Sequence, residues 1–581
     1  MEFSSNNTVW LLVCTALVFF MQAGFCMLEA GLTRAKNAGN IVMKNLVDVS
    51  IGIPLFWIAG FGIMFGTTSD ILGGIHLFAT GDYHSILPDG VPFSVFFIFQ
   101  AVFCATATTI VSGAMAERTN FKAYCIYSVV MSLLVYPVSG HWIWGQGWLS
   151  DLGFHDLAGS TAVHTVGGCA ALVGAKLLGP RIGKYDKKGR SRAIQGHNLT
   201  LAALGIMILW FCWFGFNGGS TVGIEGATVN TDGSVLWRGD LIGKIFSVTG
   251  LTAAVSTVTS LLFTWFRYRK PDVSMTLNGT LGGLVISTAS ADCISMSGAA
   301  IEGIISGIAV VLLIEFIDHV CKIDDPVGAI GVHLGCGILG TISVGLFSTG
   351  QNGCAKGLFY GGGVEQLGLQ LLGSISVIAW VSVTILIAST IIKHTVGLRV
   401  PAHVELEGLD CAEHGLSSAY AGFEISGNNF MSDADVEYET IGSEKIDVAI
   451  PAIVQSSKKS SNKNITKVQI LMKEARFERF KKAMNDIGVT GMTVTHVLGC
   501  GTQKGATEYY RGTEVDMRLL PKIQVDMVIS KVPVMDVVNA TREALYTGHI
   551  GDGKIFIYEV EDVFKVRTGE SGYTALQGAD D

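Results

Sequence analysis

The sequence predicts an α-helical polytopic membrane protein followed by a soluble α+β domain. Of its 581 residues, 49% are hydrophobic and only 15% are charged, which excludes a single soluble globule. Long uncharged runs fill the chain from about Val9 to Thr395, whereas the part from about Pro401 to Asp581 has the composition of a soluble protein. The net charge of −8 averages these two parts and indicates little about partners.

Eleven runs are long and apolar enough to be candidate membrane spans. A helix needs about 20 mostly apolar residues to cross a hydrocarbon layer about 30 Å thick. The candidate spans are residues 10–31, 41–66, 91–116, 123–145, 158–178, 199–219, 236–266, 274–290, 300–320, 327–347 and 367–395. The run at 274–290 is short and rich in Gly and Ser, so it is the weakest of these predictions.

The basic residues of the connecting loops alternate along the chain. Lys and Arg follow the odd-numbered spans, whereas residues 67–90 and 145–158 contain none. By the positive-inside rule, we expect the N-terminus outside and the C-terminal domain in the cytoplasm, in a multi-pass protein of the plasma (inner) membrane. The basic cluster 181–192 is also compatible with nucleic-acid binding, but in a membrane chain it indicates topology, and no nucleic-acid partner is expected.

The first apolar run raises the question of a cleaved signal. No basic segment precedes it, and no small-residue cleavage site follows it. We therefore interpret this run as a retained span.

Two segments share the motif D-x2-G-x3-V-H-x3-G, at 156–168 and at 325–337. His164 lies in the fifth predicted span and His333 in the tenth. Because this offset of five is odd, the two histidine-bearing helices are expected to run in opposite directions. This is typical of an inverted repeat, spans 1–5 against 6–10, which brings the two rings together near the midplane. The alternative is that each ring only forms a hydrogen bond within a tight bundle. Ionisable residues inside a membrane are functional by default, and two in matched positions favour a substrate path.

Aromatic and hydroxyl side chains near the outer ends of the spans are further candidates: Phe99, Phe103, Trp144, Phe216 and Ser220. An aromatic face attracts a cation by about 0.5–2 kcal/mol, and a hydroxyl oxygen accepts a hydrogen bond from it. An aromatic belt or ordinary helix packing is the alternative explanation.

Five segments together resemble the ammonium transporter (Amt/Mep/Rh) family: FQAVFCATATTIVSGAMAER, D-x-AGS-x-AVH, WFGFNGGS, DDPVGAIGVHLGCGILG and TVGLRVP-x6-GLD. The resemblance covers nearly all of residues 8–415, with the same number of spans. It implies that Phe103, Trp144 and Ser220 form an outer recruitment site for ammonium. It also implies that Phe103 and Phe216 form an aromatic gate.

The same resemblance assigns roles to three more pore residues. Asp156 matches the acidic residue that supports the vestibule, and His164 with His333 matches the twin-histidine pair. Because a dry pore penalises an ion far more than neutral ammonia, we expect the cation to bind outside and lose a proton, after which ammonia passes inward. The two imidazoles then either relay the proton or only orient ammonia. No enzymatic activity and no cofactor in the pore are expected, and the lack of a TVGYG-like filter disfavours a potassium channel.

The chain after the last span is predicted to divide into a linker and a compact domain. Residues 416–463 are polar without hydrophobic periodicity, so we expect a flexible linker between a membrane domain, 1–415, and a regulatory domain, 464–581. The order βαββαβ of the regulatory domain predicts a ferredoxin-like fold. Its hydrophilic loop 499–521 and Gly-rich segment 548–554 are candidate functional sites, although each is also typical of ordinary turns.

The motifs VTGMTVT, G-x-G-x-QKG, YRG, LPK and TGHIGDGKIF resemble P-II signal proteins over essentially all of 464–581. This resemblance implies binding of ATP or ADP between trimer subunits, and of 2-oxoglutarate through Mg-ATP, with Mg²⁺ near Gln503. The matching positions are Thr493, Gly501, Gln503, Lys504, Lys522, Gly551, Gly553, Lys554 and Arg567. Two departures matter: Val515 stands where many relatives carry a uridylylated tyrosine, and Lys565 stands where arginine is common.

We interpret the chain as a fusion of an ammonium transporter with its own cytoplasmic regulator, assembled as a homotrimer in the lipid membrane. Arg511 matches a loop residue that enters the inner pore mouth, so the regulatory domain is expected to dock on the transporter and gate it. The alternative is an ammonium sensor or transceptor that signals nitrogen status with little or no flux. The twelve cysteines show no metal-ligand spacing, and whether Cys293 pairs with Cys354 is left open.

Overall fold

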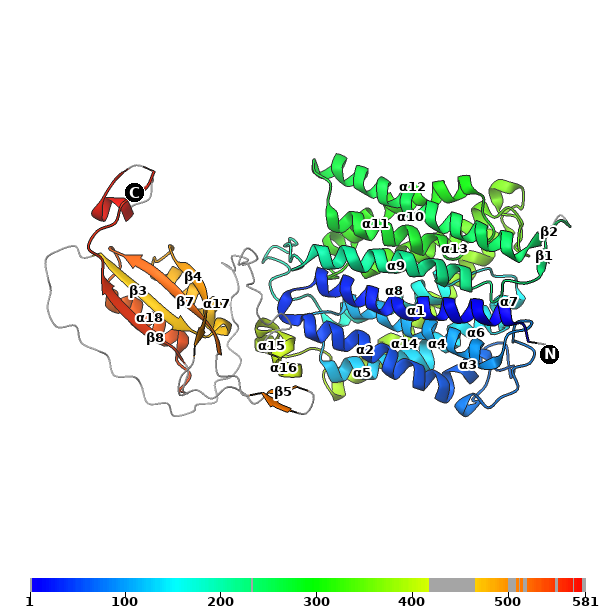
Figure 1. The fold of residues 1–581 in the computed structure, drawn as a ribbon, viewed down its shortest axis with the longest axis horizontal. Helices are drawn as coiled ribbons and strands as arrows, with labels where there is room; N and C mark the ends of the chain where they lie inside the picture. The colour runs from blue at the N-terminus through cyan, green and yellow to red at the C-terminus, as the bar shows by residue number, and fades with distance from the viewer. Residues whose placement is uncertain are drawn as a thin grey trace. The chain divides into compact units, whose positions relative to one another are not determined.

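The computed structural model describes residues 3–230, 233–416, 465–499, 508–510, 513–515, 520–548, 552–567 and 569–576. The chain divides into two compact units, Met1–Ala421 and Gly422–Asp581, each of which is described by itself (Figure 1). Residues 417–463 of the predicted linker lie outside the described residues. The same holds for five predicted site residues: Gly501, Gln503, Lys504, Arg511 and Gly551.

The first unit is a bundle of apolar helices (Figure 1). Its α-helices are α1 (Ser5–Leu32), α2 (Ala38–Leu55), α3 (Phe61–Phe65), α4 (Phe93–Ala114), α5 (Phe121–Val130), α6 (Tyr136–Trp144), α7 (Trp148–Asp151), α8 (Val166–Leu178), α9 (Leu199–Gly219), α10 (Arg238–Tyr268), α11 (Val273–Ser287), α12 (Met296–Glu315), α13 (Cys336–Phe347), α14 (Glu365–Thr395), α15 (Ala402–Glu407) and α16 (Leu409–His414). With the short helical turns that adjoin them, 10 segments of the described chain are long and apolar enough to cross a membrane. They correspond to ten of the eleven predicted runs.

The remaining predicted run, 274–290, forms the shorter helix α11 of 15 residues. At 1.5 Å per residue this helix spans only about 22 Å, less than the hydrocarbon thickness. Residues 278–287 of α11 are nevertheless all buried inside the bundle. The count of eleven spans therefore stays a prediction.

The outer surface of the bundle carries large apolar side chains. Phe211, Phe266 and Ile375 are 62%, 81% and 64% exposed. Such exposure is unfavourable in water and natural in lipid, where the backbone is satisfied within each helix. Inside, small residues let helices approach closely: a Cβ on Gly31 of α1 would lie 2.6 Å from the backbone nitrogen of Ala202 of α9.

Both histidine-bearing segments begin with the same local structure. A π-helical stretch, Ser160–Thr165, precedes α8, and a second, Ile330–Gly335, precedes α13. Just before them, Gly159 and Gly328 have φ values of +112° and +84°, a left-handed conformation that favours glycine. The shared sequence motif thus folds in the same way twice.

The second unit contains a four-stranded antiparallel sheet with the strand order β4-β7-β3-β8. The elements of this unit are β3 (Thr466–Met472), α17 (Phe477–Asp486), β4 (Thr493–Gly499), β5 (Glu508–Tyr510), β6 (Thr513–Val515), β7 (Leu520–Ile529), α18 (Val534–Leu545) and β8 (Lys554–Glu559). The predicted order βαββαβ is found in β3, α17, β4, β7, α18 and β8, and a short hairpin, β5–β6, lies inside the predicted loop. Phe480 and Met484 of α17 pack with the buried strand residues Val468 and Val525.

Candidate functional site

The two motif aspartates cap the π-helical stretches. The carboxylate of Asp156 accepts hydrogen bonds of 2.8–2.9 Å from the backbone N–H groups of residues 159–162. The carboxylate of Asp325 accepts three such bonds, of 2.7–3.3 Å, from backbone N–H groups within 327–330. Burial raises the pKa of both carboxyl groups, and these backbone donors oppose the rise. The contribution of Asp156 to the site is therefore to order the backbone of residues 159–162.

The motif glycines bring the two helices into contact. A Cβ on Gly168 would lie 2.3 Å from the backbone nitrogen of Leu334, and a Cβ on Gly337 would lie 2.6 Å from the carbonyl oxygen of Ser160. Either approach is too close for any residue other than glycine. The glycine at the end of each motif therefore accommodates the backbone of the other motif segment.

This close approach places the two predicted histidines together. The Nδ1 atoms of His164 and His333 are 3.2 Å apart, and the ring centroids are 5.2 Å apart with 26° between the planes. Both side chains are buried, at 0% and 2% exposure. Among the described residues, Nε2 of His164 has no hydrogen-bond partner. A buried ring nitrogen without a hydrogen-bond partner can form a hydrogen bond with a small polar molecule.

Aromatic rings stack along one side of this pair. The rings of Phe103 and Phe216 are stacked, with centroids 4.2 Å apart, and the ring of Phe216 is 5.6 Å from that of His164. Phe99 contacts Phe103 at 4.8 Å, and Trp144 meets Phe103 edge-on at 6.0 Å. The four predicted aromatic side chains and His164 thus form one continuous group.

The polar groups of Trp144 and Ser220 each donate a hydrogen bond to a backbone carbonyl oxygen. The indole N–H of Trp144 donates to the carbonyl oxygen of Asp156 at 2.8 Å. The hydroxyl of Ser220 donates to the carbonyl oxygen of Phe216 at 2.8 Å, which leaves the hydroxyl oxygen able to accept.

The structure adds Trp213, which the sequence analysis did not identify. Its ring stacks on His164, with centroids 5.1 Å apart, and its indole N–H donates to the hydroxyl of Thr288 at 3.0 Å. Trp213 lies three residues before Phe216 on α9, and residues at this spacing share a helix face. That spacing indicates that Trp213 shares a helix face with Phe216, and the structure adds the contact of its ring with His164.

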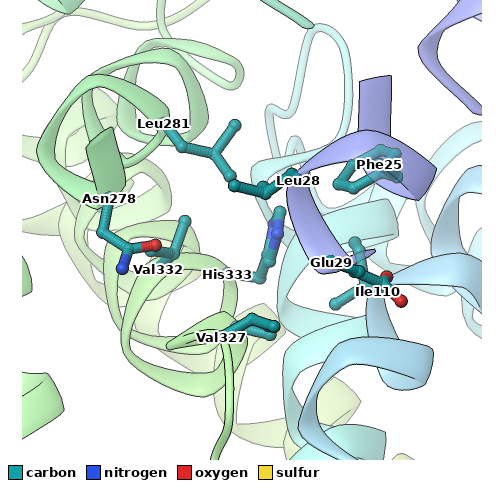
Figure 2. Close-up of a pocket in the computed structure, with 10 residues that line it drawn as sticks. Phe25, Leu28, Glu29, Ile110, Asn278, Leu281, Val327, Val332 and His333 are labelled. Atoms are coloured by element: carbon teal, nitrogen blue, oxygen red, sulfur yellow. The ribbon is translucent and has the colours of Figure 1, made fainter. Parts of the chain in front are cut away.

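A small cavity lies beside His333 (Figure 2). Its volume is about 10 Å³, close to the space one water-sized molecule needs. Figure 2 shows His333 between Asn278 of α11 on one side and Phe25 and Glu29 of α1 on the other. Glu29 is buried and accepts a hydrogen bond from the amide of Asn45 at 3.2 Å. It is the one charged residue of the run 10–31, a signal that the sequence analysis did not use.

A charged cluster joins loops that were predicted to be cytoplasmic. The carboxylate of Glu117 accepts from the backbone and the guanidinium of Arg34 and, at 3.0 Å, from Arg181. Arg181 also binds Asp324 through two parallel bonds of 2.8 and 2.9 Å. Burial alone would raise the pKa of Glu117, but Arg34 and Arg181 outweigh it and lower the pKa to about 2. The cluster ties the loops after the first, third and fifth predicted spans together.

Three described candidates of the second unit, Lys522, Gly553 and Lys554, lie at one end of the sheet. Lys554 of β8 pairs with Leu471 of β3, which in turn pairs with Gln524 of β7, two residues from Lys522. Lys522 and Lys554 therefore lie at the same end of the sheet. Gly553, just before Lys554, has a φ of +120°, and a Cβ there would lie 2.3 Å from the carbonyl oxygen of Leu471.

The other described candidates are not brought to that end. Thr493 begins β4, four residues before Val497, the pairing partner of Lys522. At the rise of an extended strand, four residues separate Thr493 from that end by about 13 Å. Arg567 lies in the segment after β8.

These features define a class first: a helical membrane protein with paired histidines inside its bundle, followed in the chain by a separate α+β unit. Comparison with known proteins then specifies the class. The model of the Ammonium Transporter Family matches residues 9–420. The model of Nitrogen regulatory protein P-II matches residues 465–570. The chain therefore belongs to the ammonium transporter family and carries a fused P-II domain.

Individual relatives agree with this assignment. Ammonium transporter Amt2 of Archaeoglobus fulgidus is 41% identical over 433 residues, which cover 71% of this chain and 88% of the relative. Ammonium transporter 3 of Dictyostelium discoideum is 35% identical over 425 residues, covering 71% of this chain and 94% of the relative. These relatives are named as transporters, not enzymes.

Solved structures show the same fold for the membrane unit. The structure titled Sensor Amt Protein has a TM-score of 0.64 and 36% identity, covering 70% of this chain and 98% of that one. Mep2 of Candida albicans has a TM-score of 0.62 and 25% identity, covering 71% of this chain and 91% of that one.

Proposed function

We propose that the membrane unit conducts ammonium, as ammonia plus a proton, through a pore that contains His164 and His333. The observation that carries this proposal is the 3.2 Å contact between the two Nδ1 atoms, together with the unpartnered Nε2 of His164. The names of the relatives support ammonium as the substrate. In this proposal Phe103, Trp144 and Ser220 recruit the cation outside the histidine pair. Phe103 and Phe216 form the aromatic gate, and Phe99 packs against Phe103.

The histidine contact has a consequence for protons. Two neutral imidazoles joined through Nδ1 need one N–H donor and one lone-pair acceptor at that contact. One ring therefore presents an acceptor at Nε2, while the other presents a donor at Nε2. When the acceptor Nε2 takes up a proton, the shared proton crosses the Nδ1 contact and the other ring releases its own Nε2 proton, so both rings stay neutral and their roles reverse. The pair thus moves one proton along a pore through which the cargo itself passes as neutral ammonia.

The experiment compares ammonium-driven currents of liposomes that contain the full chain, His164→Ala with His333→Ala, or a control. The double variant removes both relay nitrogens and should lose the current. A matched control is His319→Ala, because His319 is 60% exposed and lies away from the histidine pair. An unchanged current in the double variant would refute the proton relay.

We also propose the finer architecture and topology. The domains are a membrane domain, 1–415, a linker, 416–463, and a regulatory domain, 464–581. The membrane domain has eleven spans as an inverted 5+5 repeat plus one, with α11 included as a short span buried among longer helices. The matched π-helical stretches support the repeat, and the strand order β4-β7-β3-β8 supports a ferredoxin-like regulatory domain.

The proposed orientation has the N-terminus outside and the regulatory domain in the cytoplasm of a plasma-membrane homotrimer. The joining of Arg34, Glu117 and Arg181 in one cluster supports this orientation, because it gathers the basic loops at one end of the bundle.

We propose further that the P-II domain binds ATP or ADP and, through Mg-ATP, 2-oxoglutarate. Lys522 and Lys554 at one end of the sheet supply the cationic groups that phosphates need. The distance of Thr493 from this end supports a cleft shared by two subunits, in which one copy supplies the lysines and another supplies the threonine. Bound nucleotide and 2-oxoglutarate would set the position of the loop that carries Arg511, which gates the inner pore mouth.

A second candidate function is an ammonium sensor with little or no flux. One solved structure with 36% identity is titled Sensor Amt Protein. A sensor would bind ammonium, detected as a change in thermal unfolding, without carrying current in the same liposomes. Currents that increase with the ammonium gradient would exclude it.

A further inference from the structure

Three metal-ligating side chains converge outside the histidine pair. His155 directly precedes the capping Asp156, Cys293 follows α11, and Cys354 follows α13. Their donor atoms all lie within 4.8 Å of one another. The thiols of Cys293 and Cys354 are free and buried, and the side chain of His155 is 18% exposed. Three segments far apart in the sequence thus bring two sulfurs and an imidazole to one point.

Neighbouring groups fix the histidine ring. Nε2 of His155 contacts Oδ1 of Asp292 at 3.0 Å, and the other oxygen of Asp292 accepts from the amide of Asn352 at 2.7 Å. A carboxylate that holds one ring nitrogen of a histidine leaves the other nitrogen to bind a metal, and this arrangement recurs in metalloproteins. The backbone of His155 is also fixed, because Gln370 of α14 bonds to both its N–H and its carbonyl oxygen.

We propose that His155, Cys293 and Cys354 form a binding site for one d10 metal cation, zinc(II) or copper(I). Two thiolates and an imidazole suit these ions, whereas magnesium and calcium require oxygen ligands. With a metal–sulfur distance of about 2.3 Å, two sulfurs on a tetrahedral ion are about 3.8 Å apart. The donor atoms therefore need little movement to bind it.

The charge of the metal and its two thiolates depends on which ion binds. On binding, each thiol gives its proton to solvent, and the two resulting thiolates neutralise zinc(II). With copper(I) one negative charge remains, close to Lys244, whose ammonium donates to the carbonyl oxygen of Asp292 at 2.8 Å. The bound ion would join the loops after α11 and α13 to the segment that orders the start of the His164 helix.

The test measures metal binding directly, so its result does not depend on the proposed transport. The full chain, purified in detergent and reduced under anaerobic conditions, is titrated with cobalt(II) as the spectroscopic probe for zinc(II). Copper(I) is titrated separately in competition with a coloured chelator. We expect about one ion per chain, because three donors make one site, and a sulfur-to-cobalt charge-transfer band.

Variants locate the site. Cys293→Ser and Cys354→Ser should each abolish the charge-transfer band or halve it. His155→Ala keeps both thiols but removes a ligand, so it should weaken binding by more than the about 10–100-fold that loss of an outer-shell partner costs. Cys321→Ser is the matched control, because Cys321 is exposed and should leave binding unchanged. Thermal unfolding without metal verifies that each variant is folded, and His155→Ala still tests the site if a cysteine variant is not.

Three results would overturn the proposal. The first is no binding by the full chain, and the second is equal binding by Cys321→Ser and Cys293→Ser. The third is a disulfide between Cys293 and Cys354 in the chain purified without reductant, detected as a linked peptide pair by mass spectrometry.

Discussion

A Cβ on Gly168 would lie 2.3 Å from the backbone nitrogen of Leu334, the residue after His333. Gly168→Ala must therefore push the two histidine helices apart. We expect a loss of about 1–3 kcal/mol in stability, typical of overpacking, and a lower ammonium current, because the contact between the rings widens. Thermal unfolding in detergent and liposome currents measure the two effects.

Gly243→Ala in α10 is the matched control, since nothing lies within 4 Å of a Cβ at that position. This control should be neutral or slightly stabilising, because alanine favours the helix. If both variants unfolded at the same temperature and carried the same current, the close approach would have no role.

Asp156 and Trp213 show what a sequence motif indicates at the level of single residues and what it misses. The motif identified Asp156, but only the structure shows that its carboxylate is taken up by four backbone N–H groups. Trp213 was missed because one tryptophan in an apolar helix is usually a packing residue or part of an aromatic belt. Its stacking on His164 depends on the position of another helix, which no local pattern contains.

At the scale of elements, the loops between helices are held by buried ion pairs. Because the folded pKa of Glu117, about 2, lies below the ordinary value of 4.5, the ionised carboxylate stabilises the folded protein. This stabilisation is fully present above about pH 4.5 and is lost as the pH falls towards 2. The shift corresponds to about 3 kcal/mol.

Thermal unfolding between pH 7 and pH 3 measures this effect. The native chain should keep this stabilisation down to about pH 4.5 and lose part of it between pH 4.5 and pH 3. Glu117→Gln should start less stable and change less with pH. Glu413→Gln is the control, because Glu413 lies outside this cluster and should keep the native slope. If the stability of Glu117→Gln fell with pH as much as that of the native chain, other groups would be the cause of the acid sensitivity.

The element predictions were accurate where hydrophobic period and length agreed. Ten long runs form helices, and the four strands expected from the order βαββαβ after residue 464 are present. The π-helical stretches were not predicted, since they arise from the capping by Asp156 and Asp325 and from packing against the other motif helix. The short strands β5 and β6 were also not predicted, because the segment around them is hydrophilic.

At the scale of the whole molecule, fusion fixes one regulatory domain to each transporter. The two parts share a chain, so their ratio is constant and the linker keeps the local concentration of the P-II domain high. Deleting residues 464–581 should leave a conducting transporter whose current no longer responds to ATP, ADP or 2-oxoglutarate. Liposome currents with these ligands on the regulatory-domain side provide the measurement.

Arg511→Ala should imitate the deletion, because it removes the guanidinium proposed to enter the pore mouth. Arg511→Lys is the conservative control, since it keeps the charge and loses only the forked hydrogen bonds. A ligand response that survives in the truncated chain would exclude gating by the P-II domain.

Composition, hydrophobic period and a repeated motif predicted the two-part organisation, most of the spans and the pairing of His164 with His333. These signals are local or compare one segment with another. The stacking of Trp213, the position of Glu29 beside His333 and the convergence of His155 with Cys293 and Cys354 became visible in the folded chain alone. Their partners come from distant segments, and a single sequence carries no signal of the distance between side chains on different helices.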